Sequence, residues 1–193
     1  MNFQKAKAYA ITRLQQELPE NLYYHGLHHT LDVCQSIEKL AIREHVQAED
    51  LVILRTAGLY HDIGFVEQYQ CNEPIACRIV RESLPYFDYT STQIDIICKI
   101  ILSTQIPQRP HTHLEMIMCD ADLDYLGRDD FFEISRTLLK EWIEFGIINS
   151  TQEWNRKQIS FFQQHHYYTL TARNLREPLK LKHLHELQRV LTS

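Results

Sequence analysis

The stretch from Leu51 to Ile63 constrains the fold most, because it is one of the most apolar runs of the chain and still carries an ionisable pair near its end. Its clearly polar side chains are Arg55, Thr56, His61 and Asp62. Such a run predicts a helix that is buried almost all round. A buried carboxylate without a partner costs several kcal/mol or takes up a proton. A divalent cation would satisfy both groups of the His-Asp pair, so the sequence predicts a metal site here.

The whole chain favours an all-α fold in one domain. The 193 residues include only 5 Gly and 6 Pro, and nearly every segment has apolar residues at helical spacing, while the alternation typical of β-strands is scarce. A chain of this length can bury one substantial core and is short for two. We therefore expect residues 1–193 to form a single-domain helical bundle of about eight to nine helices.

The composition and charge of the chain indicate which binding partners and which cellular compartment to expect. The formal net charge of -5 gives no overall cationic field that would draw the protein onto nucleic acid or an anionic membrane. The five cysteines are scattered and form no CxxC pair, which is typical of reduced thiols in a cytosolic protein. The start of the chain lacks the apolar core of a secretory signal, and no run approaches the roughly 20 apolar residues that span a bilayer. We therefore expect a cytoplasmic protein without nucleic-acid or membrane partners, and a homo-oligomer is compatible with the sequence.

Helix boundaries follow from periodicity and from residues that stop or cap helices. A first helix is stopped by Pro19, and the second places His29 on its apolar side and His28 on its polar side. The helix of Leu51–Ile63 is the third, and Gly64 ends it. The later predicted helices are Glu73–Leu84, Thr92–Ser103, Leu114–Tyr125, Asp130–Phe145, one from Ser150 or Thr151 towards Tyr168, and a last segment Pro178–Leu191.

The helix of Leu114–Tyr125 carries two acidic residues in different positions relative to its apolar face. Asp122 lies at the edge of that face, whereas Asp120 projects well away from it. Helical geometry therefore predicts Asp122 as the inward carboxylate.

Four inward-facing polar residues from three helices can form one site: His29, His61, Asp62 and Asp122. Two imidazoles and two carboxylates suit one divalent ion, with Mn²⁺, Fe²⁺, Co²⁺, Ni²⁺ or Zn²⁺ favoured over Mg²⁺, which prefers oxygen ligands and retains its water. Four ligands leave positions open on a six-coordinate ion for water and for a phosphoryl oxygen of a substrate.

The predicted ligands belong to three segments, Tyr24–Val33, Tyr60–Gly64 and Cys119–Gly127. In this order and helical setting they resemble the HD superfamily of metal-dependent phosphohydrolases. The resemblance implies the ligands that the helical faces predict, namely His29, His61, Asp62 and Asp122, with Asp120 as the alternative if the predicted register is shifted. It also implies hydrolysis of a phosphoester or phosphoanhydride bond by attack of a metal-bound water.

One feature of that superfamily is missing. Members with two metal ions use additional histidines between the His-Asp pair and the final Asp. This chain has Asn72-Glu73 and Ser103-Thr104 at the places where those histidines are expected. We therefore expect a single metal ion.

Three residues are predicted to act in catalysis: His25, Asp62 and Glu67. His25 precedes His29 by four residues, a spacing that resembles cyclic-nucleotide phosphodiesterases of the same superfamily, in which the first His donates a proton to the leaving oxygen. The alternative is that His25 caps a turn or lies exposed. Glu67 follows the His-Asp helix and could orient the attacking water, although a surface carboxylate is the simpler interpretation.

Several basic residues could bind the substrate phosphate, and Arg is favoured for bidentate contact. The candidates are Arg128, Lys99 and Arg173, together with Arg109 and Arg176. The alternative for each is a solvated surface charge. His165 and His166 belong to a polar, aromatic and basic segment that could line the mouth of a cleft, and a wet helix face is the simpler interpretation of it.

The leading functional hypothesis is hydrolysis of a phosphomonoester or phosphoanhydride in a small, nucleotide-like molecule. A cyclic-nucleotide phosphodiesterase is a close alternative that His25 suggests. A non-catalytic nucleotide sensor would keep the same pocket. A di-iron oxygenase would need further nitrogen ligands, which only His111 and His113 could supply.

Overall fold

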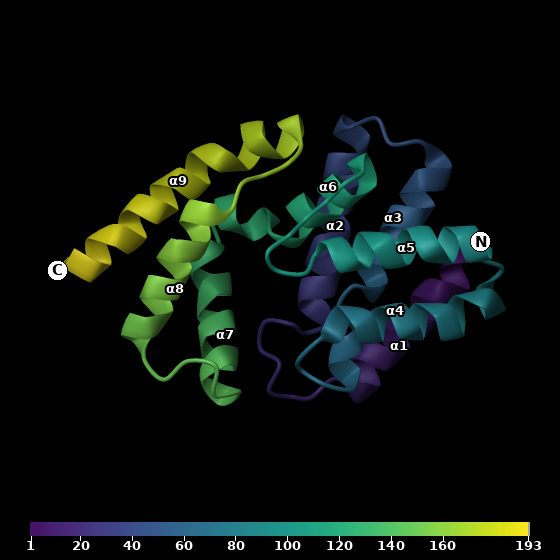
Figure 1. Ribbon diagram of the computed structural model, residues 1–193, viewed down its shortest axis with the longest axis horizontal. Helices are drawn as coiled ribbons and strands as arrows, with labels where there is room; N and C mark the ends of the chain where they lie inside the picture. The colour runs from purple at the N-terminus through teal and green to yellow at the C-terminus, as the bar shows by residue number, and fades with distance from the viewer. Residues whose placement is uncertain (193) are drawn as a thin grey trace.

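The computed structural model describes residues 1–192, with side chains through residue 189, and this part of the chain is all-α, as predicted. It contains nine α-helices, three short 3-10 helices and no strand (Figure 1). The α-helices are α1 (Phe3–Glu17), α2 (Leu27–Arg43), α3 (Ala48–Tyr60), α4 (Asn72–Ser83), α5 (Ser91–Ser103), α6 (His113–Asp122), α7 (Phe131–Glu144), α8 (Thr151–Gln164) and α9 (Leu170–Thr192). The 3-10 helices are η1 (Ile63–Val66), η2 (Leu84–Phe87) and η3 (Asp124–Gly127).

The two helices that carry predicted ligands at their ends, α3 and α6, are shorter there than predicted. α3 stops at Tyr60, so that His61 caps it and Asp62 follows it. α6 stops at Asp122 rather than at Tyr125. In both cases a 3-10 turn, η1 or η3, follows and contributes buried apolar residues.

The prediction for the last helix was wrong at its start. The proline at position 178 lies inside α9, which already begins at Leu170. Proline normally destabilises the interior of a helix, but contacts with neighbouring segments stabilise the first turns of α9. The Thr169 hydroxyl accepts a hydrogen bond from the amide of Ala172, and the Arg176 guanidinium donates to Asp124 of η3 at 2.6 and 2.9 Å.

Buried apolar side chains form two clusters on the two sides of the molecule. The larger cluster is contributed mainly by α1 to α6 and includes Ile37, Leu54, Ile97 and Met118. The smaller cluster is centred on Phe131 and is contributed mainly by η3, α7, α8 and α9. In Figure 1, α7, α8 and α9 (green to yellow) lie together on one side and α1 to α6 on the other. The predicted site lies between these two groups of helices.

Gly127 allows α9 to pack closely against η3. A Cβ atom at this position would lie 2.3 Å from the carbonyl oxygen of Arg176, too close for any side chain. The contact thus requires glycine and fixes where α9 crosses the end of η3.

Among the described helices, none combines the length and the apolar character needed to cross a membrane.

We predict that Gly127→Ala destabilises the protein by about 3 kcal/mol, because the new methyl group collides with backbone rather than with a flexible side chain. Urea unfolding would measure the change. Gly146→Ala is the control, since nothing lies within 4 Å of its Cβ position and only its φ of 65° opposes a side chain. That strain should cost about 1 kcal/mol. Equal losses in the two variants would contradict the proposed contact with α9.

Candidate metal centre

His61 is oriented by the end of its own helix. Its ring Nδ1 lies 2.9 Å from the carbonyl oxygen of Gly58, one of the acceptors that the end of α3 leaves without a helical partner. Nδ1 therefore carries a proton and donates it to this carbonyl. His61 Nε2 is left facing inward, and the side chain is only 1% exposed. Metal-binding histidines are typically held in this way by a hydrogen bond from the second ring nitrogen.

His29 and Asp122 approach the same point from two other helices. His29 Nε2, on the buried side of α2, lies 3.4 Å from His61 Nε2. Asp122 Oδ1, at the end of α6, lies 3.2 Å from His29 Nε2 and 3.4 Å from His61 Nε2. Ligand atoms of these three residues lie within 4.8 Å of one another, close enough to hold one metal ion.

Asp62 supplies the fourth group. Its Oδ2 lies 3.2 Å from His61 Nε2 and 3.5 Å from His29 Nε2. Oδ2 is buried, and no hydrogen-bond partner for it exists among the described residues. A buried carboxylate oxygen without a donor is unfavourable, and a divalent cation between the four groups would remove this cost. The residues present therefore fit a mixed nitrogen and oxygen metal site.

The electrostatics of the four groups also call for a cation. Burial alone would lower the pKa of His61, but Asp62 and Asp122 outweigh it and raise that pKa well above its usual range. Burial likewise opposes ionisation of Asp122, yet hydrogen bonds to His29 and His61 hold its pKa far below the usual value. The two carboxylates thus stay negative and require positive charge beside them. A bound metal ion and protons on the imidazoles are competing ways to provide it.

Asp120, predicted to project away from the core, is in fact completely buried. The segment before α9 covers that side of α6, and the carboxylate accepts hydrogen bonds from the amide of Tyr168 at 2.7 Å and from the amide and hydroxyl of Thr169 at 2.8 and 2.7 Å. Burial raises the pKa of Asp120 to about 6. These three hydrogen bonds hold the Asp120 carboxylate against the segment that precedes α9. Asp122 is therefore the acidic residue of α6 that faces His29 and His61.

Next to the metal centre, His25 is held by Glu141, a residue that the sequence analysis did not single out. Glu141 lies on α7 and is fully buried. One of its oxygens contacts His25 Nδ1 and accepts a hydrogen bond from the Tyr69 hydroxyl at 2.9 Å, while the other accepts from the amides of Tyr24 and His25 at 2.8 and 3.0 Å. A lone Glu on an amphipathic helix is usually a surface charge, and no local pattern indicates that a turn more than a hundred residues earlier covers Glu141.

This contact decides the charge state of His25. Burial alone would lower the pKa of His25, but the carboxylate of Glu141 and the charges of Asp62 and Asp122 outweigh it and raise the pKa. His25 also stacks on Phe65, with ring centroids 4.4 Å apart, and its ring lies 6.0 Å from that of His29. A protonated imidazole is thus placed beside the predicted ion.

A cavity of about 340 Å³ opens from the metal centre towards α7 and α8. His25, His29, Asp62 and Asp122 line its inner end, and aromatic side chains of both helices, among them Trp142 and Phe161, line the other. Asn72 and Thr104 also line the cavity. They occupy positions where further histidines would be expected if a second metal ion were bound. The Oδ1 atom of Asn72 is buried and lacks a hydrogen-bond partner in the described part of the chain.

The structure does not bring Glu67 or the predicted phosphate-binding residues into this cavity. Glu67 is exposed and forms an ion pair with Arg78 of α4. Among the predicted cations, Arg128 pairs with Asp32 and Asp130, Arg173 donates to the carbonyl oxygen of Tyr167, Arg176 pairs with Asp124, and Lys99 and Arg109 are exposed. Of the described lysines and arginines, Lys157 alone lines the cavity.

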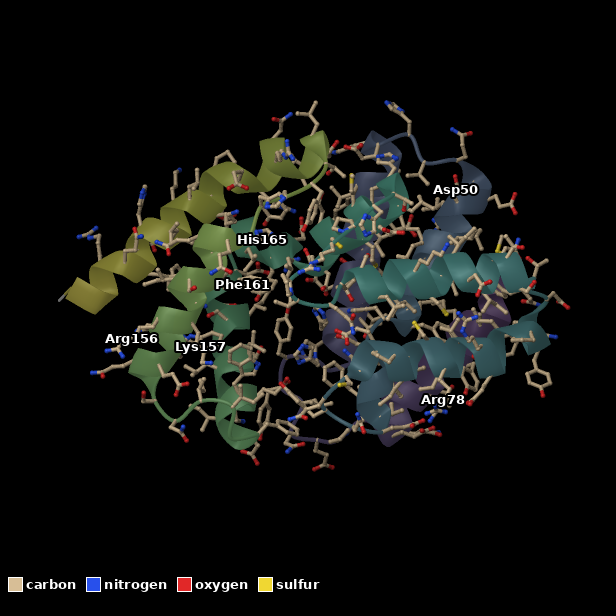
Figure 2. The ribbon with its side chains drawn as sticks, in the orientation of Figure 1. Asp50, Arg78, Arg156, Lys157, Phe161 and His165 are labelled. Atoms are coloured by element: carbon tan, nitrogen blue, oxygen red, sulfur yellow. The ribbon has the colours of Figure 1, made fainter. Side chains whose placement is uncertain are left out.

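One side of α8 lines the cavity, and it includes Lys157 and Phe161. Lys157, Phe161 and His165 follow one another at intervals of four residues, and Figure 2 shows them along the side of α8 that faces the rest of the molecule. This spacing defines one face of the helix, but the sequence does not indicate what that face meets. Arg156, the neighbour of Lys157, projects from the outer side in the same view. His165 stacks on Phe161 and lies 3.3 Å from the ammonium of Lys180, behind the cavity wall rather than in it.

The two histidines of the proline-flanked loop also lie away from the site. His113 Nε2 pairs with Glu44 at 2.9 Å, and neither His111 nor His113 lines the cavity. The structure therefore gives no support for the further nitrogen ligands that a di-iron oxygenase would need.

Comparisons with known proteins agree with this geometry. A family model described as HD domain matches residues 26–124, just over half of the chain. The crystal structure of a predicted HD superfamily hydrolase from an uncultured Thermotogales bacterium is similar in fold, with a TM-score of 0.64 and 19% sequence identity over 96% of this chain and 91% of that one. No curated protein sequence matches this chain.

We predict that Asp122→Asn weakens binding of Mn²⁺ or Co²⁺ by about a hundredfold, because it removes a charged ligand from the centre. Titration calorimetry at pH 7.5 would measure the dissociation constant. Asp120→Asn, two residues away on the same helix, should leave the metal affinity within a fewfold of wild type and should instead lower the melting temperature. The opposite pattern would make Asp120 the ligand.

Proposed function

Because this chain belongs to the HD-domain family, we propose that it is a metal-dependent phosphohydrolase that cleaves a phosphomonoester or phosphoanhydride bond of a small molecule. The observation that carries the proposal is the convergence of His29, His61, Asp62 and Asp122, with one buried Asp62 oxygen that lacks a partner among the described residues. The similar Thermotogales protein is a predicted hydrolase, which agrees with the proposal.

The four ligands would hold one divalent ion of the kind that accepts both nitrogen and oxygen, such as Mn²⁺, Fe²⁺, Co²⁺, Ni²⁺ or Zn²⁺. When bound, such an ion supplies Lewis-acid activation of water and of the phosphoryl group. Asp62 and Asp122 offset the charge of the ion, while His61 is held in the required tautomer by the Gly58 carbonyl.

His25 is the group that can complete the reaction. In hydrolysis the oxygen of a water molecule bonds to phosphorus, the bond from phosphorus to the leaving oxygen breaks, and that oxygen needs a proton. Glu141 engages His25 Nδ1, which leaves the Nε2 proton of the imidazolium for the leaving group. The Asp62 carboxylate can accept the proton that the water loses. Glu141 acts through His25 and is therefore a positioning residue.

A cyclic-nucleotide phosphodiesterase is the alternative. The Glu141–His25 pair could also protonate the leaving oxygen of a phosphodiester. A nucleotide sensor without activity would need the same metal centre but no proton donor. An assay panel that includes cyclic nucleotides separates the first alternative, and the activity of the metal-loaded protein separates the second.

We predict that the purified protein loaded with Mn²⁺ or Co²⁺ hydrolyses at least one member of a panel of phosphomonoesters, nucleotides and cyclic nucleotides. Phosphomonoesters and phosphoanhydrides would be followed by release of phosphate or pyrophosphate, and cyclic nucleotides by formation of the nucleoside monophosphate. His61→Ala should reduce the rate by at least about a thousandfold, because it removes a ligand from the ion that activates the water. Circular dichroism would show that the variant remains folded. Absence of turnover with every compound and each of these metals would overturn the proposed function.

A second prediction concerns the pH profile. The general acid must be protonated, so kcat/KM should fall as the pH rises through the pKa of His25. Since Glu141 helps to raise that pKa, Glu141→Gln should move the alkaline limb to lower pH. Tyr69→Phe removes a hydrogen bond from the same carboxylate but leaves its charge, and should move the limb much less. An unmoved limb in Glu141→Gln would show that His25 is not the titrating acid.

A further inference from the structure

We propose that the cavity beside the metal centre takes a substrate with a single phosphate group joined to an apolar, preferably aromatic, organic group. Di- and triphosphates and small sugar phosphates would be poor substrates. The inference rests on the proposed function, because it names the substrate class of the same site. The charge of the cavity, the chemistry of its walls and its volume carry the argument.

The cavity has no surplus of positive charge. Lys157 is the one described lysine or arginine in its lining, and its ammonium lies 3.8 Å from an oxygen of Glu153. The carboxylates in the lining are Asp62, Asp122 and Glu73. A divalent ion would offset the first two, and Lys157 would offset the third. The positive charge that we assign to His25, which also lines the cavity, is balanced by the carboxylate of Glu141 that contacts its ring. Each phosphate beyond the first therefore adds negative charge that this cavity cannot neutralise.

The nearby arginines cannot supply the missing charge at low cost. Arg128 donates to both oxygens of Asp32 at 2.8 and 2.7 Å and to Asp130 at 2.9 and 2.6 Å. Arg176 donates to both oxygens of Asp124 at 2.6 and 2.9 Å. Moving either guanidinium to a substrate would leave partly buried carboxylates without their partner.

The walls beyond the metal centre suit an apolar group. Eight of the lining side chains are Phe, Tyr or Trp, and a further four are Leu or Ile. Trp142 of α7 and Trp154 of α8 meet edge to face, with ring centroids 5.3 Å apart, and Phe161 follows Trp154 along α8. A flat, weakly hydrated group would gain from leaving water here. A sugar with many hydroxyls would find few polar partners on α7 and α8, where Lys157, Gln158 and the two indole N–H groups are the polar groups of the lining.

The volume of the cavity sets an upper limit on the substrate. About 340 Å³ is at the small end of the range for ligand pockets. That space accommodates one phosphate and a group of one or two rings, with the phosphate at the inner, metal-binding end and the rings between α7 and α8.

The test uses the metal-loaded protein and two series of compounds. One series holds the charge fixed and changes the organic group: glycerol phosphate, phenyl phosphate and 1-naphthyl phosphate. The other holds the organic group fixed and changes the charge: a nucleoside monophosphate, diphosphate and triphosphate. We expect KM to fall about tenfold or more along the first series, because more apolar surface is buried, while kcat also changes because phenol and naphthol are better leaving groups than glycerol. We expect kcat/KM to fall about tenfold or more along the second series.

A pair of variants connects the preference to the cavity. Phe161→Ala should reduce the ratio of kcat/KM for 1-naphthyl phosphate to that for glycerol phosphate by about fivefold or more, mainly through KM. Phe132→Ala is the matched control, because Phe132 packs against the same apolar cluster but does not line the cavity. It should lower stability and leave the ratio unchanged.

The outcomes separate this inference from the proposed function. No phosphate release from any compound would overturn the function itself. Turnover that is fastest with the triphosphate, or with glycerol phosphate, would overturn the inference and leave the function standing. The same reduction of the ratio in Phe132→Ala and Phe161→Ala would also overturn it, because the preference would then not arise from the cavity wall.

Discussion

The interaction on which the site depends is the attraction between two buried carboxylates and a positive charge that must lie between them. Asp62 and Asp122 come from different helices and meet at the imidazoles of His29 and His61. One Asp62 oxygen has no hydrogen-bond partner among the described residues. Burial makes the need for positive charge strong, because water screens the carboxylates poorly. The ends of α3 and α6 therefore meet at a point where protonated imidazoles or a bound cation must supply that charge.

A third carboxylate, that of Glu141, connects the two groups of helices. Glu141 on α7 accepts hydrogen bonds from the turn that precedes α2 and from Tyr69, which follows η1. The same contact helps to raise the pKa of His25 and holds its ring next to His29. The cavity lies between the two groups of helices that Glu141 connects, so α7 both lines the cavity and holds His25 in place.

The sequence was sufficient to predict the all-α fold, because helical periodicity is a local property. The same local pattern selected His29, His61, Asp62 and Asp122 as candidate ligands, because each is a polar exception on a buried helix face or helix end, and the structure brings these four side chains together. Contacts between distant segments were out of reach. Asp120 could not be recognised as buried without knowing that Thr169 covers it, and Arg128 could not be removed from the phosphate site without seeing Asp32 beside it. The role of Lys157 and the wall of α8 likewise depend on how α7 and α8 pack against the rest of the chain.

The two acids of α6 have a joint consequence. Asp122 faces the ion site, while Asp120, two residues earlier, holds the amides at the entrance to α9. One short piece of backbone therefore serves both the metal and the attachment of the last helix. The attachment of the last helix and the candidate metal centre therefore share one turn of α6, so a change in the position of α9 would act on the backbone next to Asp122.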